Sequence, residues 1–175
     1  MGDTPEGQVT LERSNVLTFK RWNVYQEIGM ANKGGTITSL QICTAHRAPM
    51  EQKQALRAIS DMGMEGDLHA KRGSARQVLF MDEETLAAFG LGAGRVRENI
   101  TTRGIELKTL AAGTRLRVGG AVFEITKACD PCELIEDIRP GLREEMEGQR
   151  GMLARVIEGG EMRVGDAIVA LNIDR

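Results

Sequence analysis

The sequence has 175 residues, of which 41% are hydrophobic and 27% charged, a composition typical of one folded domain rather than a disordered chain. Its formal net charge of −2 gives no bulk attraction to nucleic acid or to an anionic membrane, so a charged ligand would need a local site. No apolar run approaches the roughly 20 residues of a membrane span, the first residues lack the apolar core of a secretory signal, and three cysteines do not suit a secreted disulfide framework. We therefore expect a cytoplasmic protein with no nucleic-acid or membrane partner.

Residues 1–34 stand apart from the rest of the chain, because their apolar residues follow no clean period. They also hold the only tryptophan and the only tyrosine. The sequence therefore predicts an N-terminal extension of uncertain structure over 1–34 and one domain over 35–175. The extension either takes no share in the chemistry or packs as an extra element on the domain or on a second subunit.

The first half of the domain alternates between strand-like and helix-like patterns. Residues 36–43 alternate in side-chain character and predict a strand. Residues 50–62 place apolar residues at helical spacing and predict a helix. A buried type of strand follows over 77–81, and Asp82 is suited to cap a short helix over 83–89.

The second half is rich in glycine turns. Strand-like arms surround Gly119-Gly120 and again Gly159-Gly160, so each glycine pair predicts a two-residue hairpin turn. Between them, residues 132–148 form a helix-like stretch that Pro140-Gly141 interrupts. Several short strands with frequent glycine turns and a few helices predict an α+β, mostly β fold with a barrel-like sheet.

Cys129 and Cys132 form a C-D-P-C motif where a strand-like run meets a helix-like run. A closed zinc site needs four nitrogen or sulfur ligands, and only Cys43, His46 and His69 remain to complete one, none of them in a second C-x-x-C. A redox pair at a helix N-terminus is a second interpretation, although the βαβ framework of thioredoxins is missing. The third is a proline-shaped turn with two small buried thiols. The motif alone leaves these alternatives open.

Asp67 and His69 lie in the stretch G-D-L-H. A histidine two residues after an acid is suited to metal binding or proton transfer. The alternative is an aspartate that caps a turn and a histidine that hydrogen-bonds the backbone. With no second histidine nearby, the local pattern favours this structural alternative.

A further candidate is the segment G-A-G-R-V-R-E-N-I-T-T-R-G, residues 92–104. Alternation along a strand would place four donor side chains on one face: Arg95, Arg97, Asn99 and Thr101. Guanidinium forks, an amide and a hydroxyl are suited to a phosphate or another oxyanion. The alternative is a solvated edge strand, which an asparagine in the middle of the run disfavours, because asparagine is a poor strand former.

The order of the motifs along the chain resembles the MOSC domain, which is named after the C-terminal domain of molybdenum-cofactor sulfurases. The resemblance spans about residues 35–171 and rests on these pieces in order: G-x-I-x-S-L, E-G-D-L-H-A, R-Q-V, R-E-N-I-T-T-R-G-I-E-L, L-A-A-G-T-R-L-R-V-G-G-A-V-F-E-I-T, C-D-P-C, R-G-M-L-A-R-V and V-G-D-A-I. It is most like the small bacterial stand-alone MOSC proteins. The resemblance implies a closed or nearly closed β-barrel of the pyruvate-kinase type with a few peripheral helices.

The resemblance also implies a site. In family members that bind molybdenum cofactor, a cysteine at the place of Cys132 ligates the metal, and a segment similar to residues 95–100 lies at the cofactor end. Cys132 would then be the metal or sulfur ligand, and Asp67 and His69 would orient the site or move protons. The residues that would bind the phosphate of molybdopterin are Arg95, Arg97, Asn99 and Thr101.

The function that this resemblance implies is molybdenum-cofactor binding, in sulfur carriage or in the reduction of N-hydroxylated substrates. Reduction would need a separate electron-donor reductase, because the chain has no flavin, haem or iron–sulfur motif. Sulfur carriage would need a separate desulfurase, because 175 residues cannot hold the pyridoxal-phosphate domain of the sulfurases. The alternative, from another class, is a non-enzymatic module that carries a persulfide on Cys132 or binds a protein of the cofactor pathway, without a metal of its own.

Overall fold

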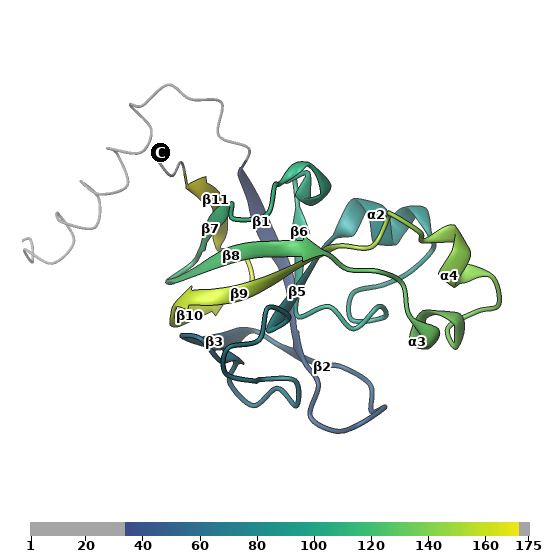
Figure 1. Cartoon of the computed structure of the whole chain (residues 1–175), viewed down its shortest axis with the longest axis horizontal. Coiled ribbons are helices and arrows are strands. Elements are labelled where there is room, and N and C mark those ends of the chain that lie inside the picture. Colours follow the sequence, from purple (N-terminus) through teal and green to yellow (C-terminus); the bar gives the residue numbers. More distant parts are fainter. Residues whose placement is uncertain (1–33, 172–175) are drawn as a thin grey trace, which may run out of the picture. The chain divides into compact units, whose positions relative to one another are not determined.

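The computed structural model describes residues 34–171, which form mostly strands with short helices between them (Figure 1). The strands are β1 (Gly34–Ile42), β2 (Glu51–Lys53), β3 (Ala55–Ile59), β4 (Gly63–Met64), β5 (Val78–Asp82), β6 (Ile100–Arg103), β7 (Arg115–Val118), β8 (Ala121–Ala128), β9 (Met152–Glu158), β10 (Gly160–Arg163) and β11 (Ala167–Leu171). The helices are α2 (Glu83–Ala88), the 3-10 helix η1 (Leu107–Thr109), α3 (Glu133–Glu136) and α4 (Leu142–Glu145). The predicted extension over 1–34 lies outside the described residues except for Gly34, where β1 begins.

Seven strands close into a barrel in the order β1-β11-β7-β8-β9-β5-β6, with β6 returning to β1. Closure depends on β1, which pairs with β11 through residues 34–36 and with β6 through residues 36–40. The β5–β6 pair is parallel, and the other pairs of the ring are antiparallel. β2 pairs with the last residues of β1, 40–42. β10, β3 and β4 form a small second sheet. The expected mostly β barrel with a few peripheral helices is confirmed.

Two apolar clusters determine how the helices attach to the barrel. The barrel interior is centred on Phe80 and Phe123, whose wholly buried rings meet edge to face with centroids 5.2 Å apart. A second cluster lies between the barrel end and the helices, which Figure 1 shows beyond the ends of β5 and β8. It contains Met81, Leu86, Val96, Ile135, Leu142 and Met146. Burial of these side chains holds α2, α3, α4 and the chain before β6 together at one end of the barrel.

The predicted helix over 50–62 is wrong. These residues form β2 and β3, and in β3 the side chains of Leu56 and Ala58 are buried while those of Arg57 and Ile59 are exposed. This alternation has the period of a strand. Over so short a window the same apolar residues also fit helical spacing, and the pairing of β3 with β10 selects the strand.

The predicted hairpin at Gly159-Gly160 is also wrong. β9 pairs with β8 and β5, whereas β10 pairs with β3. The two glycines allow close packing of neighbouring chains: a Cβ at Gly159 would lie 2.8 Å from the carbonyl oxygen of Ala58, and one at Gly160 would overlap the carbonyl group of Gly120. Glycine is needed here because other backbone approaches closely, not because the chain turns back on itself.

Other local predictions are confirmed. β7 and β8 form a hairpin at Gly119-Gly120, and Asp82 caps α2 by accepting the N–H of Thr85 at 2.9 Å. The helix-like stretch divides at Pro140-Gly141 into α3 and α4. Within residues 34–171, no helix is long and apolar enough to cross a membrane.

Candidate functional site

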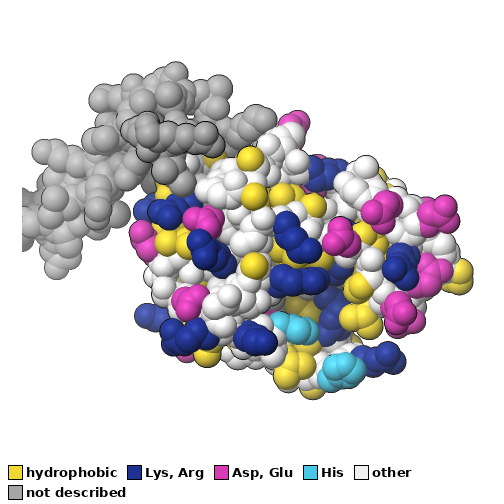
Figure 2. All heavy atoms as spheres, in the orientation of Figure 1, with side chains coloured by type: hydrophobic (Ala, Val, Ile, Leu, Met, Phe, Trp, Pro, Cys, Tyr) yellow, Lys and Arg dark blue, Asp and Glu magenta, His cyan; other side chains and the backbone are white. Residues whose placement is uncertain are grey.

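The helical end of the barrel carries a cleft of about 360 Å³. It is formed by the loop after β1, by the loop before β6 and by α3. The lining residues are Arg47, Ala48, Pro49, Met50, Ala93, Gly94, Arg95, Arg97, Leu134, Asp137 and Ile138. In the view of Figure 2, Lys and Arg side chains gather near the middle of the molecular surface, with histidine side chains beside them.

The lining of the cleft combines positive charge with apolar surface. Three arginines and one aspartate contribute to it, so its local charge is positive. Arg47 and Arg95 are exposed, and among the described residues no carboxylate pairs with either guanidinium. Met50, Leu134 and Ile138 supply apolar surface. This combination suits an organic molecule that carries an anionic group.

Two of the cleft arginines have unusual backbone conformations. Arg47 has a φ of 59° and Arg97 a φ of 65°, and among the described residues only one other non-glycine residue, Asp61, has a positive φ. The left-handed region costs a residue with a Cβ on the order of 1–2 kcal/mol. Such residues persist where their surroundings impose the conformation, and they concentrate at functional sites. The backbone of the cleft is therefore held in place by its contacts.

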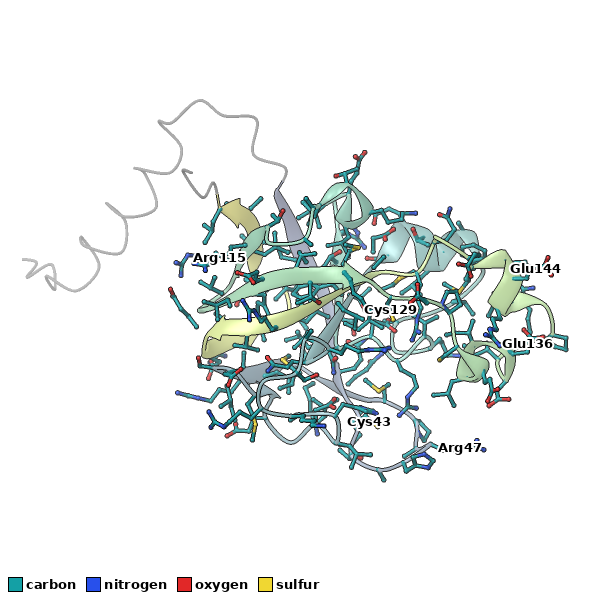
Figure 3. All side chains as sticks on the ribbon, in the orientation of Figure 1. Cys43, Arg47, Arg115, Cys129, Glu136 and Glu144 are labelled. Atoms are coloured by element: carbon teal, nitrogen blue, oxygen red, sulfur yellow. The ribbon has the colours of Figure 1, made fainter. Side chains whose placement is uncertain are left out.

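Arg97 joins the two loops of the cleft. It belongs to residues 94–98, called the arginine loop below. Its Nη1 donates to the carbonyl oxygen of Ala48 at 3.0 Å, and its Nη2 lies 2.6 Å from Sγ of Cys43. Cys43 is buried directly after β1, and Figure 3 shows it on the same side of the barrel end as Arg47. Cys43, for which the sequence predicts no role, therefore anchors a cleft arginine.

The predicted placement of Arg95, Arg97, Asn99 and Thr101 on one strand face is wrong. β6 begins only at Ile100, and the chain before it turns, with Arg97 in the left-handed region. The structure brings Arg95 and Arg97 to the cleft and buries Asn99 and Thr101. The four residues are close in the chain, but only the two arginines face the cleft.

Asn99 and Asp67 form a buried scaffold near the cleft. The Oδ1 of Asn99 accepts the N–H of Leu79 at 3.1 Å, and its Nδ2 donates to Oδ2 of Asp67 at 2.9 Å. The same Oδ2 accepts the N–H of Cys43 at 2.9 Å. The pair thus connects the end of β1, the start of β5 and the loop of Asp67. Direct cofactor contact by Asn99 stays a prediction.

His69 lies at the surface beside this scaffold. Its side chain is 60% exposed, and its Nδ1 lies 3.2 Å from Oδ1 of Asp67, which also accepts the backbone N–H of His69 at 2.7 Å. A buried carboxylate at one ring nitrogen orients the imidazole and leaves the other nitrogen to the solvent. Asp67 therefore accepts backbone N–H groups, as the structural alternative predicts, and also holds a ring that is suited to proton transfer.

Cys132 occupies the N-cap position of α3, where its thiol is exposed and makes no capping hydrogen bond. Nη1 of Arg150 lies 3.8 Å from its Sγ and donates to the carbonyl oxygen of Asp130 at 3.0 Å. Nη2 of Arg150 donates to the carbonyl oxygen of Val96 at 2.8 Å. The buried Arg150 therefore links the thiol to the arginine loop. Sequence reasoning missed Arg150, although it opens the R-G-M-L-A-R-V motif.

Cys129 has a different environment from Cys132. It is buried against Leu79 and Leu153, and burial raises the pKa of its thiol, with Arg150 as the largest opposing influence. The two cysteines are not joined by a disulfide. Figure 3 shows Cys129 where the chain leaves β8 toward α3. Of the two, only Cys132 presents its thiol to the solvent.

Comparison with known proteins identifies the family. The model of the MOSC domain matches residues 67–169, more than half of the chain. The chain belongs to the MOSC domain family. A search of curated proteins found no match.

Solved structures of low sequence identity share the MOSC fold of this chain. YuaD from Bacillus subtilis superposes with a TM-score of 0.68 at 21% identity, over 81% of this chain and 97% of YuaD. YiiM from Escherichia coli gives 0.63 at 19% identity, over 79% of this chain and 71% of that one. YiiM from Geobacillus stearothermophilus gives 0.65 at 16% identity, over 79% and 75%. At these identities the likeness concerns the fold.

The MOSC family is associated with molybdenum cofactor binding, and the residues at the barrel end fit such a group. The exposed sulfur of Cys132 is a soft ligand of the kind that suits a sulfur-rich metal centre, and the arginine-lined cleft suits an anionic group. Within residues 34–171, no group of three or more His, Cys, Asp or Glu side chains could hold a metal ion. A metal at Cys132 would therefore need its other ligands from the cofactor.

Proposed function

We propose that this MOSC protein binds molybdenum cofactor at the helical end of its barrel, with Cys132 as the metal or sulfur ligand. One observation carries the proposal: the exposed Cys132 thiol is linked through Arg150 and Val96 to the loop that supplies the cleft with two arginines. Two polar contacts of Arg150 thus join the sulfur ligand to the loop that carries the two cleft arginines.

Each side chain has a proposed role that follows from its chemistry. Arg95 and Arg97 bind the phosphate of the cofactor, and Arg47, which the sequence motifs do not indicate, adds a third guanidinium to the same cleft. The apolar side of the cleft excludes water from the rest of the ligand. The buried side chains of Asn99 and Thr101 support the loop that carries the two arginines. The cofactor, when bound, supplies two-electron redox chemistry.

His69 and Asp67 have a proposed role in moving protons. The imidazole is exposed and its Nδ1 faces the buried carboxylate, so Nε2 is the atom that would give or take a proton. The activity would be sulfur carriage or the reduction of N-hydroxylated substrates. Reduction consumes protons and electrons, and the electrons would come from a separate reductase. Sulfur carriage would draw on a separate desulfurase.

The test is metal and pterin analysis of the protein isolated from a host that makes molybdenum cofactor. We expect molybdenum and pterin in the wild-type protein and loss of most of the molybdenum in Cys132→Ser. Cys129→Ser is the matched control, because that thiol is buried, and we expect it to keep its metal. Wild-type protein without molybdenum, or Cys132→Ser with an unchanged metal content, would contradict the proposal.

A second candidate function is a carrier of persulfide on Cys132, without a metal of its own. The observation that favours it is the exposed thiol of Cys132, which is in no disulfide and which a desulfurase could reach. Mass spectrometry would then find an adduct of one sulfur atom, ~32 Da, on the peptide of Cys132. That adduct together with an absence of pterin fluorescence would favour the carrier over the cofactor-binding protein.

A further inference from the structure

Glu98 is a carboxyl group buried within the arginine loop. Its side chain has no exposed surface. The Oε1 accepts the backbone N–H of Gly94 at 2.6 Å, the hydroxyl of Thr101 at 3.1 Å and the amide of Gln41 at 3.3 Å. The hydrogen bond to Gly94 closes the loop from its last residue to its first. Glu98 therefore fixes the backbone of the loop that carries Arg95 and Arg97.

Within residues 34–171, no charged side chain pairs with Glu98. β1 contributes Gln41, β6 contributes Thr101, and the loop itself contributes backbone N–H groups. The charged side chains of the loop point elsewhere, because Arg95 lines the cleft and Arg97 donates to the carbonyl oxygen of Ala48. Burial raises the pKa of Glu98, against the lowering effect of its hydrogen bonds.

Two oxygens in this cluster lack a donor. Among the described residues, Oε2 of Glu98 and Oε1 of Gln41 are buried without a hydrogen-bond partner. A buried, ionised carboxylate without a cation is far more costly than a neutral one. A proton on Oε2 would turn one of the two unpartnered acceptors into a donor. The neutral acid therefore fits this cluster better than the carboxylate.

We propose that Glu98 is the positioning residue of the cleft and that it works as a neutral carboxylic acid: its Oε1 holds Gly94 and thereby sets the spacing of Arg95 and Arg97 for an anion. The anion-binding part of this inference rests on the proposed function. Gly94 itself suits the role, because its φ of 83° is favourable only for glycine and an added Cβ would lie 3.3 Å from Cβ of Met50.

The first test measures the binding of inorganic phosphate by calorimetry to the full-length protein. We expect Glu98→Ala to weaken binding about tenfold, because the N–H of Gly94 loses its acceptor. Glu98→Gln should restore the affinity to within about twofold, since its amide oxygen accepts the same hydrogen bond without a charge. Equal weakening by both variants, or no weakening by Glu98→Ala, would overturn the proposal.

The matched control is Glu84, an exposed glutamate whose Oε1 also accepts a glycine N–H, that of Gly104 at 3.0 Å. Glu84 does not line the cleft. Glu84→Ala should leave the phosphate affinity of the protein unchanged. A loss equal to that of Glu98→Ala would mean that the effect is not specific to the arginine loop and would overturn the proposal.

A second test does not depend on any ligand. Hydrogen exchange of the Gly94 amide should be faster in Glu98→Ala and as slow in Glu98→Gln as in the wild type.

The infrared carbonyl band of a protonated carboxylic acid should be present at neutral pH in the wild type and absent in Glu98→Gln. If the wild type binds no phosphate, the anion site of the proposed function fails, while these measurements still decide the role of Glu98. Absence of the infrared band in the wild type would overturn the proposal that Glu98 is a neutral carboxylic acid.

Discussion

Cys129 and Cys132 lie in one four-residue motif but have opposite environments. Packing against Leu79 and Leu153 buries the first, while the second is exposed at the start of α3. The thiolate is the reactive form of cysteine, and burial disfavours it. The C-D-P-C motif therefore contains one accessible thiol and one buried thiol.

We expect Cys132 to react with an alkylating reagent at least about tenfold faster than Cys129 or Cys43, because both of the latter are buried. Peptide mapping by mass spectrometry after short exposures measures the three rates. Denatured protein is the control, in which the three cysteines should react at similar rates. Equal rates in the folded protein would contradict the assigned environments.

The pH dependence of stability tests Glu98. Its folded pKa is raised above the ordinary value of 4.5, so the unfolded chain releases this proton first, and the contribution of Glu98 to the free energy of unfolding falls as pH rises above about 4.5. Glu98→Gln does not show this fall in stability, because glutamine does not titrate. The stability of the variant relative to the wild type should therefore rise with pH, by at most about 1.4 kcal/mol per unit. Urea unfolding at pH 4 and pH 7 measures it, and an unchanged difference would contradict a raised pKa.

At the scale of single residues, the sequence could indicate some members of the site but not their environments. Arg95 and Arg97 do line the cleft, yet Asn99 is buried with its amide bound to Asp67. Arg47 and Arg150 come from distant segments and reach the site only through the fold. Their contribution depends on loop conformations that no local pattern encodes.

At the scale of elements, the sequence predicts correctly those elements that depend on residues close in the chain, and it fails where distant partners decide the structure. The cap at Asp82 and the hairpin at Gly119-Gly120 form between residues that are close in the chain. The assignment of residues 50–62 and the function of Gly159-Gly160 depend on β10 pairing with β3 and on close contact with other strands. Those partners are far away in the sequence.

Gly151 provides a test at this scale. A Cβ at Gly151 would overlap the carbonyl oxygen of Phe80, and the carbonyl group of Gly151 accepts the N–H of Cys129 at 2.9 Å. Gly151→Ala must therefore displace β9 from β5, and we expect a loss of about 3 kcal/mol in the free energy of unfolding. Gly148→Ala is the control, because a Cβ there would meet no atom within 4 Å although its φ of 66° costs some strain. Equal losses in the two variants would contradict the close approach.

At the scale of the whole molecule, closure of the barrel brings the site together. β1 pairs with both β11 and β6, and its end delivers Cys43 to Arg97 and Asp67. The resemblance of the ordered motifs to the MOSC domain implies the closed β-barrel, so the sequence predicts the fold even where predictions for single elements are wrong.

Asn99 tests this connection. Asn99→Ala would leave the N–H of Leu79 without its acceptor and would remove one donor from the buried Asp67. We expect a loss of about 2–3 kcal/mol in the free energy of unfolding, measured in urea. Gln52→Ala, at an exposed amide on β2, is the control and should change stability by less than about 0.5 kcal/mol. A small effect of Asn99→Ala would contradict the scaffold role.

The central claim is that the thiol of Cys132 ligates a cofactor metal at the barrel end. X-ray absorption at the molybdenum edge tests it directly, because it counts the sulfur atoms bound to the metal. We predict one more sulfur neighbour in the wild-type protein than in any molybdenum retained by Cys132→Ser, and no such difference for Cys129→Ser. The same sulfur count in the wild type and in Cys132→Ser would contradict the account.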